Sequence, residues 1–144
     1  MGNTIKLKKY SDVIEEYVAA GVITPGMLVE YNVDGEVVAD TGENEFPMFA
    51  LEDELQGNGI DDDYAAADPV QCWIPYRGDQ VFGLLTGADV IAGDYLQSAG
   101  DGTLEKYVPE AETLAYPLPK YIVAQALEAV APDGETVRVK ARMV

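Results

Sequence analysis

Residues 91–107 read IAGDYLQSAGDGTLEKY, and this stretch decides how the rest of the chain is interpreted. Two short runs typical of β-strands, residues 94–98 and 103–107, flank the tetrapeptide Ala99-Gly100-Asp101-Gly102. An Asp-Gly pair supplies the positive φ angles that tight hairpin turns require. The stretch therefore predicts a β-hairpin. Metal loops and phosphate cradles also use glycine and aspartate, so both alternatives need a separate test.

Further strand signals lie on both sides of this hairpin. The pairs Asp34-Gly35 and Asp133-Gly134 each separate runs that suit strands, and residues 137–143 (VRVKARM) alternate apolar with basic side chains. Such alternation is typical of a half-buried strand with one charged face. The other predicted strands are residues 27–33 (MLVEYNV), 36–40 (EVVAD), 70–76 (VQCWIPY) and 80–86 (QVFGLLT).

Evidence for helices is sparse. Residues 11–21 (SDVIEEYVAAG) offer Ser11 as an N-cap, apolar side chains at helical spacing and Gly21 as a stop, which predicts one short helix. Residues 121–131 (YIVAQALEAVA) fit either a strand or a helix. Residues 57–69 and 108–119 are predicted loops, the second because its prolines disfavour a central strand. The predicted fold class is mainly β with at most one or two short helices.

Length and composition indicate one intracellular domain. The chain has 144 residues, a typical size for a single domain. No run approaches the roughly 18 apolar residues of a membrane span, and the N-terminus lacks the apolar region of a secretory signal. The single cysteine excludes an intrachain disulfide, which fits a reducing, cytosolic origin.

The charges are unevenly placed along the sequence. There are 26 acidic and nine basic residues, and all the acids lie between Asp12 and Glu135. That acidic middle argues against nucleic-acid binding, because Lys and Arg contacts to phosphate supply most non-specific affinity. The basic ends would be drawn to acidic surfaces, either neighbouring copies or another protein, or they merely solvate the ends of the chain, and the sequence leaves both interpretations open. The six basic residues at the ends are Lys6, Lys8, Lys9, Arg138, Lys140 and Arg142.

Catalytic and metal-site patterns are weak, and we predict no catalytic, cofactor-binding or metal-ligating residues. The chain has no histidine and one cysteine, Cys72, which disfavours nucleophilic catalysis and zinc binding. Carboxylate pairs for glycoside hydrolysis arise by chance among 26 acids. Residues 94–105 begin and end with acids like an EF-hand loop, but Leu96 and Ala99 occupy positions that need a ligand and a glycine.

Two short motifs have simpler structural interpretations. Arg77-Gly78-Asp79 spells an integrin-binding tripeptide, yet a hairpin turn between two predicted strands explains it. The run Asp61-Asp62-Asp63 could hold a cation through adventitious oxygens, but a solvated acidic loop is the favoured interpretation. Cys72 alternates with Val70 and Ile74 on one face of a predicted strand, as a buried apolar residue does.

Three segments together resemble a known family. Residues 90–107 (VIAGDYLQSAGDGTLEKY), 122–130 (IVAQALEAV) and 137–143 (VRVKARM) resemble the head decoration, or capsid cement, proteins of tailed bacteriophages. Residues 11–71 match these proteins only in the general order of their elements. The resemblance implies a small β-barrel or β-tulip with a flexible N-terminal arm. It also implies a non-enzymatic homotrimer that binds the outer surface of the mature head and stabilises the shell.

The resemblance divides the chain into an N-terminal arm, residues 1–20, and a β-rich decoration domain, residues 21–144. The implied partner is the major capsid protein, to which the arm adds a strand, with no nucleic-acid or membrane partner. The implied location is the outer capsid surface of the virion, and the host cytoplasm during assembly. Alternatives are a tail-tube or head-completion subunit, a carboxylate-based hydrolase or a calcium-binding module. The implied capsid-binding residues are Asn3, Thr4, Ile5, Lys6, Leu7, Lys8 and Lys9.

Overall fold

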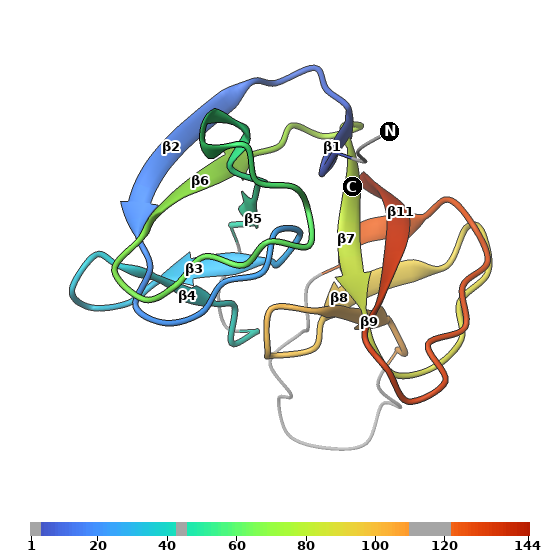
Figure 1. The fold of residues 1–144 in the computed structure, drawn as a ribbon. Helices are drawn as coiled ribbons and strands as arrows, with labels where there is room; N and C mark the ends of the chain where they lie inside the picture. The colour runs from blue at the N-terminus through green and yellow to red at the C-terminus, as the bar shows by residue number, and fades with distance from the viewer. Residues whose placement is uncertain (1–3, 43–45, 110–121) are drawn as a thin grey trace.

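A computed structural model describes residues 4–42, 46–109 and 122–144, and it is mainly β. Figure 1 shows two lobes, one built around β7 and β11 and the other around β2 and β6. The described elements are β1 (Lys6–Lys8), β2 (Val13–Val18), β3 (Val29–Tyr31), β4 (Val37–Ala39), β5 (Phe49–Ala50), the 3₁₀ helix η1 (Glu54–Gln56), β6 (Pro69–Ile74), β7 (Gln80–Leu85), β8 (Tyr95–Ser98), β9 (Leu104–Lys106), β10 (Ile122–Ala126) and β11 (Val137–Met143).

The first lobe is a closed five-stranded barrel, which confirms the predicted small β-barrel. Strands β7, β11, β10, β8 and β9 are successive neighbours, and a parallel pair between β7 and β9 closes the ring. β1 and β9 pair with the same edge of β7. β9 pairs at Leu85, near one end of β7, and β1 pairs at Gln80 and Val81, near the other end. Small side chains such as Ala124 and Ala141 pack inside the barrel with Leu85, Leu96 and Leu104.

The second lobe has its own core between a three-stranded sheet and a hairpin. The sheet has the order β2-β6-β5, and β3 pairs with β4 around Asp34-Gly35, as predicted. Cys72 and Val70 are buried in this core, which confirms the interpretation of Cys72 as a buried side chain. Phe49 and Trp73 belong to the sheet of the second lobe but pack into the barrel core, so the two lobes share a hydrophobic contact.

The hairpin predicted in residues 91–107 is present. β8 and β9 pair antiparallel, with Ser98 opposite Leu104, and the connection between them holds Gly100 and Gly102 at positive φ. Gly102 lies against Ala39, Met27 and the carbonyl of Leu28, so the turn packs on the second lobe. The segment that fits either a helix or a strand forms β10, which pairs with β8 and β11.

The helix predicted for residues 11–21 is wrong, because residues Val13–Val18 form β2. This strand pairs antiparallel with β6 over its whole length, from Val13 opposite Ile74 to Val18 opposite Pro69. Backbone pairing with a distant strand therefore overrides the helical spacing of the apolar side chains. Among the described residues, η1 is the only helical element, and no described helix is long and apolar enough to cross a membrane.

The predicted hairpin at Arg77-Gly78-Asp79 is also wrong. The strands on either side, β6 and β7, belong to different sheets and do not pair with each other. The segment is instead a crossing from the second lobe to the barrel. It forms a turn whose Asp79 amide donates to the carbonyl of Tyr76, at 3.0 Å.

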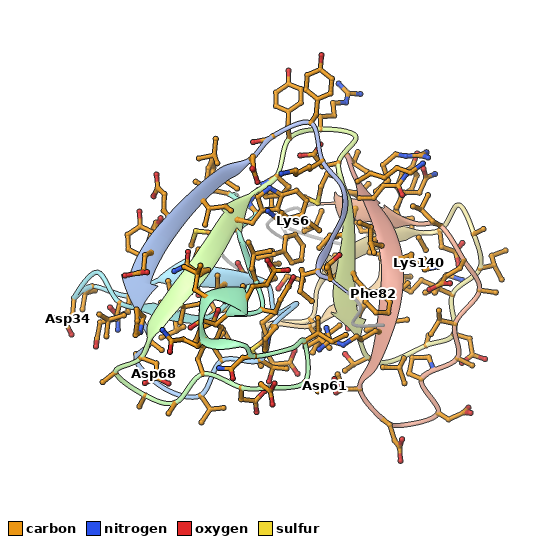
Figure 2. The ribbon with its side chains drawn as sticks, turned by 45° about the horizontal axis from the view of Figure 1, so that its top comes forward. Lys6, Asp34, Asp61, Asp68, Phe82 and Lys140 are labelled. Atoms are coloured by element: carbon orange, nitrogen blue, oxygen red, sulfur yellow. The ribbon has the colours of Figure 1, made fainter. Side chains whose placement is uncertain are left out.

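Arg138 of β11 fastens the barrel to the second lobe. Its guanidinium donates to the carbonyl oxygens of Pro25, at 2.9 Å, and Ile60, at 2.6 Å. It also lies 3.7 Å from an oxygen of Asp61 and 5.7 Å from the ring centre of Phe82. Figure 2 shows Asp61 and Phe82 facing this junction between the lobes. The Asp61–Asp63 loop thus contributes one carboxylate to an ion pair with a basic side chain.

We expect Arg138→Met to lower the free energy of unfolding by about 2–4 kcal/mol, because it leaves two carbonyls without their charged donor. Equilibrium denaturation in urea measures this change. Arg142→Met is the matched control, since Arg142 is exposed on the same strand, and it should cost less than about 0.5 kcal/mol. Equal losses in the two variants would contradict the role of Arg138.

Candidate functional site

The predicted capsid-binding arm is a strand on this chain's own barrel. Lys6 of β1 lies opposite Val81 and Lys8 opposite Gln80 of β7. Ile5 is fully buried in the barrel core, and its amide donates to the buried carboxylate of Glu52, at 3.1 Å. Asn3 lies outside the described residues. The arm therefore adds its strand to β7 of its own chain.

Two lysines of the arm share one acid. Lys6 Nζ lies 2.9 Å and Lys9 Nζ 2.8 Å from the two carboxylate oxygens of Asp12. Hydrogen bonds from Lys9 and Lys6 lower the pKa of Asp12 to about 2. All three side chains are solvent-accessible, so these ion pairs contribute little to stability. They link the arm to the residue that precedes β2.

A groove of about 400 Å³ runs along the arm. Thr4, Lys6 and Lys9 line it on one side, and the acidic residues Glu52–Glu54 next to η1 line it on the other. The groove therefore has a basic wall and an acidic wall. Together with the arm's backbone it forms a site to which an extended peptide segment could add.

Asp79 ties together the two crossings between the lobes. Its buried carboxylate accepts hydrogen bonds from the amides of Tyr10, Ser11 and Tyr76, the last two at 3.2 and 2.8 Å. Tyr10 and Ser11 lie between β1 and β2, whereas Tyr76 lies between β6 and β7. One carboxylate thus fixes both crossings. Because its oxygens are engaged by backbone amides, the Arg77-Gly78-Asp79 motif serves a structural purpose.

The two basic ends of the chain meet on β7. Lys8 and Arg142 both lie opposite Gln80, one on each side of it, next to a register shift between Lys6 and Lys8 in the β1–β7 pairing. Figure 1 shows β1 and the C-terminus beside each other at this end of β7. The sequence analysis identified both basic ends, but only the strand order brings them together.

The other candidate groups carry no site of their own. Burial raises the pKa of the Cys72 thiol to about 12, so it stays protonated and unreactive. Asp62 accepts a hydrogen bond from the amide of Gly59, at 2.7 Å. Within the described ranges, no three acidic or thiol side chains gather closely enough to hold a metal ion.

Asp40 is a buried acid beside the β8–β9 hairpin. One of its oxygens accepts hydrogen bonds from the amide of Gly42, at 2.7 Å, and the hydroxyl of Ser98, at 2.9 Å. The other oxygen has no hydrogen-bond partner among the residues that the structure describes. Desolvation raises the pKa of Asp40 above its ordinary value, so the folded state favours the protonated form.

The pH dependence of stability should reveal this acid. Because the pKa of Asp40 is raised on folding, its contribution to stability is complete below its unfolded pKa and is lost as the pH rises through its folded pKa. We expect the stability of Asp40→Asn relative to the parent chain to increase from pH 4 upwards. Denaturation at pH 4, 6 and 8 measures the difference, and a difference independent of pH would contradict this assignment.

Comparisons with known proteins bear on the fold as a whole. The chain is a two-lobed, mainly β protein with a small closed barrel. A crystal structure with a similar fold is that of the N base of the head fibre gp8.5 of bacteriophage phi29, at a TM-score of 0.58. The match covers 92% of this chain and 93% of that one, at 19% sequence identity, so the likeness concerns the fold. No protein-family model and no curated protein matches the sequence.

Proposed function

We propose that this chain is a non-enzymatic structural protein of a bacteriophage head. The supporting observation is the similarity of fold, along 92% of the chain, to a protein described as the base of a phage head fibre. The resemblance to head decoration proteins supports the same class from a different source, the residues of β8–β11. Two independent likenesses, one in fold and one in sequence, therefore agree on a head-associated role.

In the finer form of the proposal, the chain is a trimeric cement protein on the outer capsid surface, bound to the major capsid protein. Such a ligand stabilises the mature shell by mass action, because it binds that lattice preferentially. The edge strand β2 supports contacts between copies, since it exposes Val13, Ile14 and Val18 by 50, 38 and 45%. Apolar side chains on an open sheet edge are typical of interfaces.

The docked position of the arm changes how it would meet the capsid. Because β1 already pairs with β7, the arm would present its open edge and the adjacent groove to the major capsid protein as a preformed strand. A preformed strand loses less conformational entropy on binding than a free arm does. Deletion of residues 1–9 is an unsuitable test, since it removes Ile5 from the barrel core.

The attachment base of a head fibre is the second candidate function. The similar structure favours it, because that protein is the base of a phage head fibre. The two candidates predict different effects on the shell. A cement protein raises the temperature at which the shell falls apart, whereas a fibre base needs only to attach.

The experiment combines three measurements on the purified chain. Light scattering gives its solution mass, co-sedimentation with expanded, empty shells of its phage gives binding, and calorimetry gives the disruption temperature of the shells. A trimer that binds and raises this temperature supports a cement protein, and binding without a rise supports a fibre base. Self-assembly into rings or tubes would support a tail-tube or head-completion subunit. A monomer that does not bind shells would contradict both proposals.

A further inference from the structure

Six exposed residues from three parts of the sequence form one surface at the end of the barrel where the two lobes are joined. We name it the basic pole. It carries four of the nine basic residues of a chain whose net charge is −17. Its members are Lys8, Lys9, Tyr10, Tyr76, Arg77 and Arg142.

Contacts between these parts show that the basic pole is continuous. Lys8, Lys9, Tyr10 and Arg77 line one open pocket of about 230 Å³, although they come from different crossings between the lobes. Arg142 is the neighbour of these residues across the sheet, because Gln80 of β7 pairs with Arg142 of β11 on one side and with Lys8 of β1 on the other. The carbonyl of Met143 also accepts a hydrogen bond from the amide of Gly78, at 3.0 Å, which holds the end of β11 against this turn.

Two tyrosine side chains project next to each other from the basic pole. The rings of Tyr10 and Tyr76 lie 6.2 Å apart, and the residues are 90% and 63% exposed. Both backbone amides are bound by the buried carboxylate of Asp79, so the tyrosines are fixed at their bases. Prepositioned tyrosines lose little entropy on binding and are frequent among the residues that dominate interface energies.

The acidic groups next to the basic pole are only partly engaged, since Asp53 and Glu54 line the neighbouring groove together with Lys9. Asp79 is buried beneath it and accepts three backbone amides, and Asp12 pairs with Lys6 and Lys9. Other acids lie further off: Figure 2 shows Asp34 and Asp68 on the outer side of the second lobe. Counted with Asp12 and Asp79, the basic pole still has four basic residues against two acidic ones, a local excess of positive charge on a strongly acidic protein.

We propose that the basic pole is the surface that docks on an acidic patch of a head-shell protein. This inference rests on the proposed head-associated function and names the surface and partner chemistry for it. The acidic body would be repelled by such a patch, so electrostatics orient the molecule with its basic pole inward. The tyrosine pair supplies the apolar contact, and Lys8, Arg77 and Arg142 supply the charge, together with Lys9, which also pairs with Asp12.

The shell fits better than two other acidic partners. A second copy bound by its acidic body would make a heterologous contact, which forms filaments unless the rotation closes. An extended nucleic acid bound at the four cations would also be repelled by the 26 acidic residues of the chain. A protein patch of limited extent can engage the basic pole without approaching most of these residues.

The test measures affinity for expanded, empty shells of the source phage in 50 and 300 mM NaCl. The variants are Lys8→Gln/Arg77→Gln and Tyr10→Ser/Tyr76→Ser. Lys106→Gln/Lys140→Gln is the control that removes two charges outside the basic pole, and Tyr95→Ser is the control for an exposed tyrosine. We expect each basic-pole variant to weaken binding about tenfold or more, with the controls within about twofold. The charge variant should also show a smaller salt dependence.

Each other outcome has a defined meaning. If the parent chain binds shells and the basic-pole variants bind them equally well, this inference is overturned and the proposed function stands. Parent chain that does not bind shells contradicts the proposed function and the partner with it. A basic-pole variant with a smaller solution mass identifies a second copy as the occupant, and release from shells by duplex DNA at constant ionic strength identifies nucleic acid. Either result also overturns the inference. Unchanged thermal transitions in all variants confirm that they are folded.

Discussion

Asp79→Ala is expected to lower the free energy of unfolding by about 4 kcal/mol, because three backbone amides lose a charged acceptor in a buried site. The residue is 2% exposed, so water does not readily replace the carboxylate. Since Asp79 fixes both crossings between the lobes, the loss also loosens the basic pole. For a chain of this size the melting temperature should fall by about 8–16 °C. Thermal unfolding followed by circular dichroism measures it.

Asp34→Ala is the matched control for Asp79. Asp34 lies in the exposed β3–β4 turn, and its replacement should change stability by less than about 0.5 kcal/mol. Asp79→Asn should fall between the two, because an amide retains one acceptor oxygen but presents a donor to the remaining amide. If Asp79→Ala were as stable as Asp34→Ala, the carboxylate would not hold the two crossings.

Gly26→Ala should be nearly as damaging, at about 3 kcal/mol or more. Gly26 has a φ of +94°, and a Cβ there would lie 2.6 Å from Nη1 of Arg138 and 3.0 Å from the carbonyl oxygen of Phe82. The backbone oxygen belongs to β7 and the guanidinium is held by two carbonyls, so neither can move easily. The strain of a positive φ adds to this clash. Urea denaturation measures the sum.

Gly35→Ala separates the two causes in Gly26→Ala. Gly35 also has a positive φ, of +77°, but a Cβ there would meet nothing within 4 Å. Its replacement should therefore show the backbone strain alone, about 1 kcal/mol. A similar loss in both variants would mean that the junction between the lobes accommodates a methyl group.

The hairpins were predictable because their signals are local. The Asp-Gly pairs at Asp34-Gly35 and Asp101-Gly102 set the backbone angles of a turn, and the flanking residues favour strands by their own shape. The predicted strands 94–98 and 103–107 thus match β8 and β9 to within about a residue at each end. The same reasoning predicted a mainly β chain and the burial of Cys72.

Strand β2 could not be predicted in this way. Its apolar side chains lack the alternation of a half-buried strand because β2 is an edge strand exposed on both faces. Its conformation depends on β6, which lies more than fifty residues further along the chain. A pairing over such a distance leaves no local pattern, whereas the accidental spacing of Val13, Ile14, Tyr17 and Val18 imitates a helix.

The candidate site was predictable only in its charges. The lysines of residues 6–9 and the basic side chains of residues 138–142 stand out in an acidic sequence. Tyr10, Tyr76 and Arg77 do not, since nothing local indicates that two crossings between sheets run side by side. The one local pattern in the sequence that pointed to this part of the site was the predicted turn at Arg77-Gly78-Asp79. Its correct interpretation needed the knowledge that β6 and β7 belong to different sheets.

The position of β7 has a consequence for the timing of folding during synthesis. This strand lies in the middle of the sequence, but its neighbours β1 and β11 are the first and last of the described strands. β11 is also a member of the ring, so the barrel cannot close until residues 137–143 have left the ribosome. We expect closure to be late and slow, as in other proteins dominated by distant pairings. Until then β7 and β10 each have an edge that can pair with the wrong chain, and the acidic charge of the nascent polypeptide then helps to keep copies apart.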